Sequence, residues 1–203
     1  YWSVLFNISL YRHIAFLDRQ EAFRLIQEPV RSFNLRYDDL ALDKMWRVTA
    51  GHPYFLQLLC HAVVNQQNQL RRAYVTISDV NAALDDILAS GEAHFLYLWS
   101  ESTPAERLVL TALARMIPLT GHAAPMQIAD YLAERGVSLE RQQIRDALHK
   151  LTLRDILQIA ADMDATVSIG ETYRWKLGLL SLWVEKYRSF SRVAAEVNNL
   201  QQP

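Results

Sequence analysis

Residues 49–60 read TAGHPYFLQLLC, which joins a helix stop directly to a helix start and then runs apolar. Gly51 can adopt the left-handed conformation that closes a preceding helix, and Pro53 suits the first turn of the next helix, where its missing N–H is not needed. The stretch therefore predicts a tight corner between two helices. Free N–H groups at the start of the second helix can receive a phosphate or another anion, although an ordinary helix connection is the alternative.

Segments on both sides of this corner predict further helices. Asp18 followed by Glu21 is a capping-box pattern, and Pro29 is expected to end the helix that they begin. Only a strand fragment is expected at residues 74–76. The expected helices run from the cap at Asp18 to Pro29, from about Asp38 or Asp39 to Ala50, from Pro53 to about Asn68, from a cap at Ser78 or Thr76 through Leu88, and from Glu92 to Ser100. Residues 18–100 are therefore predicted to form a helical bundle.

A second unit follows this bundle. Thr103-Pro104-Ala105-Glu106 combines a threonine cap, a proline at the first helical position and a glutamate at the capping-box position. After three helical segments, residues 156–159 and 172–177 alternate apolar and polar side chains, as the two strands of a hairpin do. This order is typical of a winged helix, whose third helix usually reads DNA. We place the winged-helix domain at 101–190, followed by a C-terminal tail at 191–203.

The predicted fold is thus mainly α, with a small β-hairpin, and the composition agrees with a globular protein. The 203 residues are 51% hydrophobic and 21% charged, with a formal net charge of −1. This charge gives no global field to hold nucleic acid or a membrane surface, so either contact requires a local patch. The single cysteine, Cys60, excludes an intrachain disulfide and indicates a reducing, cytoplasmic compartment. No apolar window approaches the length of a membrane span, no signal peptide follows Tyr1, and we expect no membrane partner.

The sequence contains none of the common catalytic or metal-binding motifs. No glycine is followed by lysine, which excludes a P-loop within this chain. The histidines form no His-Glu-x-x-His pattern, and His52 and His61 are too far apart for zinc spacing. We therefore expect no catalytic residue and no metal site.

The order of the segments carries a resemblance over nearly the whole chain. The matching lid segments are AFRLIQEPV at 22–30, LRYDD at 35–39, GHPYFLQLLC at 51–60 and YVTISDV at 74–80. Together they resemble the helical lid of AAA-like and STAND ATPases, which are signalling relatives of the AAA+ machines. Lids of this group are often followed by a winged helix, whose ending is similar to YRWK at 173–176 and LLSLW at 179–183.

This resemblance implies a nucleotide-facing role for Gly51, His52 and Pro53. The glycine would be the hinge and the proline would pack near the base, while His52 stands where many AAA+ lids have a phosphate-sensing arginine. Residues 18–100 would be the lid domain, and residues 1–17 the tail of an ATPase core missing from this chain. That core would act in cis and bind ATP or ADP with Mg. We expect this chain alone neither to hydrolyse ATP nor to bind it tightly.

The winged helix leaves two function classes open. The expected reading helix at 139–155 carries four basic and three acidic side chains, a net charge of only +1. A patch this weak favours a regulatory unit that docks a protein effector over one that contacts DNA. A helical protein-interaction module unrelated to ATPases is a further alternative, and oligomerisation of the parent stays open. The candidate contacts to DNA or protein are Arg141, Arg145, His149, Lys150, Arg154, Arg174 and Lys176.

Overall fold

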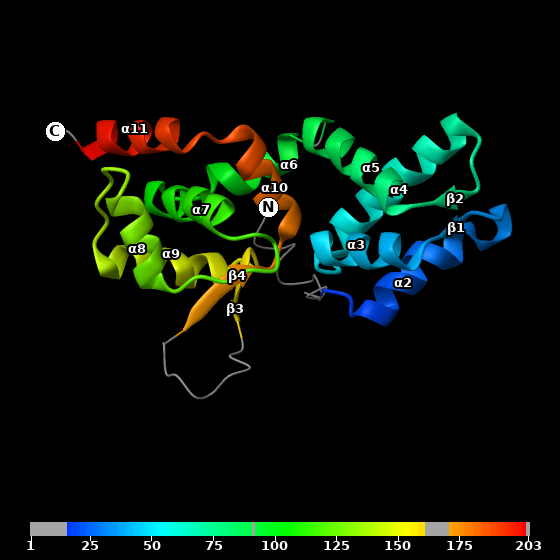
Figure 1. Cartoon of the computed structure of the whole chain (residues 1–203), viewed down its shortest axis with the longest axis horizontal. Coiled ribbons are helices and arrows are strands. Elements are labelled where there is room, and N and C mark those ends of the chain that lie inside the picture. The colour runs from blue at the N-terminus through cyan, green and yellow to red at the C-terminus, as the bar shows by residue number, and fades with distance from the viewer. Residues whose placement is uncertain (1–15, 91, 161–170, 202–203) are drawn as a thin grey trace, which may run out of the picture.

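The computed structural model describes residues 16–90, 92–160 and 171–201, which are mainly helical with two small sheets (Figure 1). The first half contains α2 (Arg19–Gln27), the 3-10 helix η1 (Glu28–Phe33), β1 (Arg36–Tyr37), α3 (Asp39–Thr49), α4 (Pro53–Leu70), β2 (Tyr74–Val75), α5 (Ile77–Ser90) and α6 (Glu92–Ser100). The second half contains α7 (Pro104–Met116), α8 (Pro125–Ala133), α9 (Arg141–Leu153), β3 (Leu157–Ala160), β4 (Thr172–Trp175), α10 (Gly178–Tyr187) and α11 (Phe190–Gln201). The mainly α class with a small β-hairpin is confirmed.

Side chains at the helix starts satisfy backbone N–H groups that the helices cannot. The N–H of Glu21 donates to Asp18 Oδ1 at 2.8 Å, and the N–H of Asp18 donates to Glu21 Oε2 at 3.2 Å. Thr103 and Glu106 form the same reciprocal pair at the start of α7. Such pairs fix where a helix begins, because they replace two hydrogen bonds that the first turn lacks. Both predicted capping boxes are therefore confirmed.

Three elements differ from the sequence expectations. The chain does not leave helical structure at Pro29 but continues as η1, since a proline at the first turn of a helix needs no N–H. No strand is expected from the sequence at Arg36–Tyr37, but β1 forms there and pairs in parallel with β2. Helix α11 occupies much of the expected tail at 191–203 and packs against α7, with Val193 and Val197 buried.

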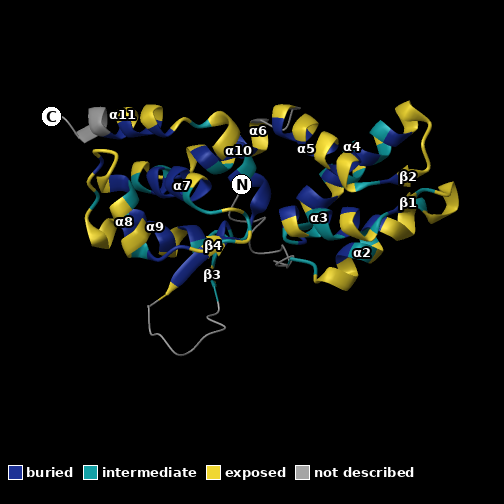
Figure 2. Cartoon of the chain, in the orientation of Figure 1, coloured by how far each residue is buried: buried dark blue, intermediate teal, exposed yellow. Residues whose placement is uncertain are grey.

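Helix α10 joins the two halves into one continuous core (Figure 2). It packs against α7 in the second half and against α3 and α5 in the first half. A Cβ atom added at Gly178 would lie 3.1 Å from the carbonyl oxygen of Val48, so the first turn of α10 approaches the backbone of α3 closely. The predicted boundary near residue 100 is therefore not a break in the packing.

The corner between α3 and α4 has the backbone that the sequence predicts. Gly51 has a φ of 73°, and Ala50 beside it is also left-handed. The N–H of Leu17 donates to the carbonyl oxygen of Gly51 at 2.9 Å. A Cβ atom at Gly51 would lie 2.1 Å from the carbonyl oxygen of Leu17, so no larger residue fits without moving the backbone.

We expect Gly51→Ala to destabilise the fold much more than Gly136→Ala. Gly136 also has a positive φ, of 74°, but an added Cβ atom there meets nothing within 4 Å. Gly136→Ala should cost about 1 kcal/mol for the left-handed alanine. Gly51→Ala should cost about 2 kcal/mol more, because the methyl group collides with Leu17. Urea unfolding of the two variants measures the difference, and equal losses would show that Leu17 yields without cost.

Candidate functional site

The structure places Gly51, His52 and Pro53 at a corner that is largely closed by its own hydrogen bonds. The hydroxyl of Thr49 donates to the carbonyl oxygen of Met45 at 2.8 Å and accepts from the N–H of Gly51 at 3.3 Å. The N–H of His52 donates to the carbonyl oxygen of Thr49 at 2.9 Å. Pro53 then begins α4 without an N–H to offer. Two of the N–H groups that an anion would need are thus already used within the corner.

The imidazole ring of His52 packs against two aromatic rings. Its imidazole lies edge-on to Phe16 at 5.1 Å and to Phe55 at 5.0 Å between centroids. Its Nδ1 is buried and has no hydrogen-bond partner among the described residues. Burial lowers the pKa of His52 below its ordinary value, so the side chain is neutral at pH 7. It offers no positive charge to a phosphate.

A series of rings leads from the corner into the second half, and we call His52, Phe55, Phe95 and Trp183 the ring series. Phe55 on α4 stacks on Phe95 of α6, with centroids 5.8 Å apart. Phe95 stacks in turn on Trp183 of α10 at 5.7 Å, and Trp99 lies edge-on to Trp183 at 6.1 Å. Because Phe95 and Trp183 are almost fully buried, these contacts link the corner to the second half without intervening solvent.

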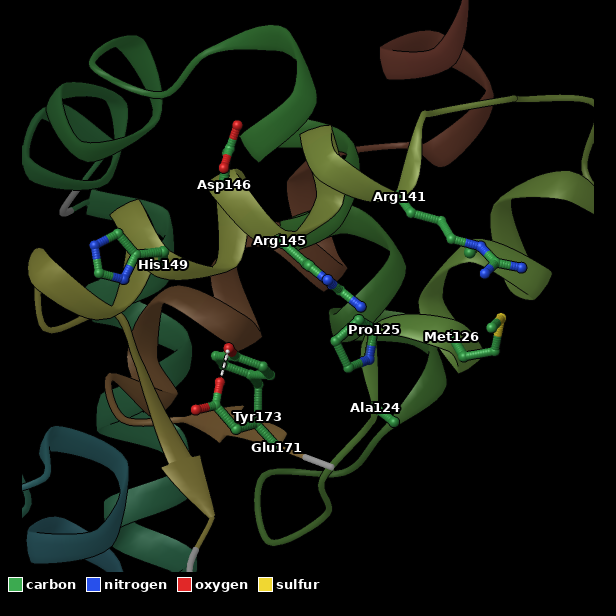
Figure 3. A pocket seen from close by; sticks show the side chains of 10 residues that line it. Ala124, Pro125, Met126, Arg141, Arg145, Asp146, His149, Glu171 and Tyr173 are labelled. Atoms are coloured by element: carbon green, nitrogen blue, oxygen red, sulfur yellow. Dashed lines mark hydrogen bonds between the residues drawn. The ribbon is translucent and has the colours of Figure 1, made fainter. Parts of the chain in front are cut away.

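Three of the predicted contact residues on α9 border a cavity of about 550 Å³ between the start of α8, one face of α9 and β4 (Figure 3). We call it the α8–α9 cavity. Arg141, Arg145 and His149 line it at successive helical turns, so they lie along one face of α9. The two guanidinium groups extend towards Pro125 and Met126 at the start of α8 (Figure 3).

The acidic side chains that border the α8–α9 cavity already have partners. The carboxylate of Asp146 points away from the arginines (Figure 3) and accepts from Gln142 Nε2 at 2.8 Å. Glu171 Oε2 accepts a 2.8 Å hydrogen bond from the hydroxyl of Tyr173. Burial, with a further contribution from Glu171, raises the pKa of Tyr173 to about 12, so the phenol keeps its proton.

Two of the predicted contact residues form ion pairs with acidic residues of the chain. Arg154 Nη1 lies 3.1 Å from Glu106 Oε2, and its Nη2 donates to the carbonyl oxygen of Leu98 at 2.9 Å. Lys176 Nζ lies 2.7 Å from Asp155 Oδ1. Arg154 and Lys176 therefore form ion pairs within the chain, whereas a contact of either residue with DNA or protein stays a prediction.

Two further predicted contacts are exposed outside the α8–α9 cavity. Lys150 is exposed on α9, and Arg174 is exposed on β4 opposite Gln158. Sequence reasoning missed Met126 and Tyr173 as members of the site, because they reach the cavity from other elements. A proline such as Pro125 is typical of a helix start, but its position opposite Arg145 depends on the fold.

Metal and membrane features can be assessed over residues 16–90, 92–160 and 171–201. Within these residues, no group of three or more His, Cys, Asp or Glu side chains could hold a metal ion. None of the helices described there is both long and apolar enough to span a bilayer. A scan against models of known protein families and a search of curated proteins found no match to this chain.

We expect Arg154→Ala and Arg141→Ala to differ sharply in stability. The side chain of Glu106 is only 4% exposed, so losing Arg154 leaves a buried carboxylate without its cation. The free energy of unfolding should fall by about 2 kcal/mol or more for Arg154→Ala. It should change by less than about 0.5 kcal/mol for the exposed Arg141→Ala. Urea titration followed by far-ultraviolet circular dichroism measures both, and similar values would place Arg154 among the surface residues.

Proposed function

We propose that this chain is the regulatory lid and winged-helix portion of a STAND or AAA-like ATPase. In this role it couples nucleotide state to conformational change and to the docking of a protein effector. The resemblance of the lid segments and of the winged-helix ending supports the family. The observation that carries the coupling is the ring series from His52 to Trp183.

The ring series supports coupling because close-packed interiors transmit displacements. Phe55 follows the corner directly on α4, so a shift of the corner moves its ring. Phe95 and Trp183 are almost fully buried, and in a close-packed interior the displacement of one ring is transmitted to the next. The close approach of Gly178 to the backbone of Val48 adds a second, rigid contact between the halves. A movement of the lid would therefore reposition α10 and the winged helix with it.

The proposal assigns nucleotide chemistry to another part of the polypeptide. ATP or ADP with Mg would bind a P-loop core in cis, and this chain would contribute no catalytic residue. His52, being neutral, would contribute a ring contact at the edge of that site and no charge. The cytoplasm is the compartment in which such an ATPase would work.

Docking of a protein has more support than docking of DNA. With Arg154 and Lys176 engaged internally, the exposed cationic side chains left among the candidates are Arg141, Arg145, Lys150 and Arg174. Exposed Glu140 and Asp146 lie next in sequence to Arg141 and Arg145, and exposed Glu171 borders the α8–α9 cavity, so the net positive charge offered to phosphates is small. Contact with DNA through α9 is the second candidate, since Arg141 and Arg145 are exposed.

We expect Phe95→Leu to weaken the coupling in the full-length ATPase. In the wild type, exchanging ADP for a non-hydrolysable ATP analogue should alter amide hydrogen exchange in both α4 and α10. Phe95→Leu should preserve the change in α4 and reduce it in α10, because the stacked ring is lost. Phe190→Leu is the matched control, since Phe190 is a buried ring that contacts Tyr131 outside the ring series.

Three results would contradict the proposal. The first is a full-length polypeptide without a P-loop, which would favour the unrelated interaction module. The second is a wild type whose α10 does not respond to nucleotide. The third is an equal response in the wild type and in Phe95→Leu, which would exclude the ring series as the route.

We expect no band shift when the chain is mixed with duplex DNA at low salt. The α9 face carries too little net positive charge to release many counterions. A shift that weakens steeply with added salt, and that is lost when Arg141 and Arg145 are both replaced by glutamine, would instead support the DNA candidate. Electrophoretic mobility measured across a salt series separates the two results.

A further inference from the structure

We propose that the α8–α9 cavity binds an acidic segment of a protein partner, held in an extended conformation. The inference rests on the proposed function, because it specifies the chemistry of the protein that docks there. The evidence consists of two unpaired guanidinium groups, their spacing, and the apolar wall that faces them.

Arg141 and Arg145 are unpaired cations within the part of the chain that the structure describes, since neither forms an ion pair there. The carboxylates that border the cavity cannot fill this role, because Asp146 points away and Glu171 is held by Tyr173. The amino end of α8 opens on the same space and adds the positive end of its dipole. The cavity therefore has unused capacity for carboxylate oxygens, and charge complementarity defines its occupant.

The spacing of the two arginines indicates how the acids are arranged. Arg141 and Arg145 are four residues apart on α9, so their Cα atoms are separated by about 6 Å along the helix axis. In an extended peptide, side chains two residues apart lie on the same side and about 6.6 Å from each other. An acid-x-acid pattern in an extended segment thus matches the arginine pair, and each carboxylate can accept a charge-assisted hydrogen bond.

The remaining wall favours a peptide over a nucleic acid. Met126 is 48% exposed and lies with Pro125 and Ala129 beside the arginines, where an apolar side chain can be covered. A volume of about 550 Å³ accommodates a few side chains of a peptide. We therefore infer a ligand with two acidic residues flanking one position and an apolar residue next to them.

The test is a selection of displayed random dodecapeptides on the purified chain. Enriched peptides should carry Asp or Glu at positions i and i+2 with an apolar neighbour. A synthesised, fluorescently labelled enriched peptide should bind about tenfold or more weakly to the Arg141→Gln, Arg145→Gln double variant, as measured by fluorescence anisotropy. The matched control is Arg31→Gln, Arg36→Gln, which removes the same charge at a separate cavity beside η1.

Several outcomes would overturn the proposal. They are enrichment of peptides without the acidic pattern, no enrichment, equal binding by the double variant, and equal loss in the control variant. Tighter binding of a short DNA duplex through the same two arginines would also overturn it. Far-ultraviolet circular dichroism verifies that both variants are folded. Loss of peptide binding leaves the nucleotide response of α10 untouched, so failure here and failure of the coupling are distinguishable.

Discussion

Trp183 packs at the joint between the two halves, and the arrangement of the molecule depends on its burial. Its ring contacts Phe95 and Trp99, and the guanidinium carbon of Arg188 lies 4.2 Å from its centroid. A buried tryptophan removes a large apolar area from water and restricts its neighbours to a few ring geometries. This contact holds the first-half helices and α10 in a fixed arrangement, and the proposed coupling relies on that arrangement.

The predictable part of the fold is the part encoded by neighbouring residues. The boxes at Asp18 and Thr103 and the corner at Gly51 need only three or four residues to specify them, so they can be read from one sequence. The pairing of β1 with β2 joins two-residue strands from distant parts of the chain, which are too short to show periodicity. The polar residues of α11 obscured its apolar stripe.

The candidate site likewise has one part that the sequence predicts and one part that depends on contacts between distant residues. The stripe of Arg141, Arg145 and His149 follows from helical spacing alone. The role of Arg154 does not, because its partner Glu106 lies 48 residues away and on another helix. Counting charges along α9 treats the four basic residues as equivalent, whereas burial separates one that maintains the fold from those that face solvent. A formal net charge therefore does not show which of these cations are ion-paired within the chain.

Because α10 packs against both halves of the molecule, the two halves are not independent modules. A polypeptide cut near residue 100 would leave the faces of α3 and α5 uncovered on one side and the apolar face of α10 on the other. Each piece would expose an apolar surface that promotes association with other chains, so neither could be exchanged freely between proteins during evolution. Domain shuffling would instead have to move both halves together, as one inherited block.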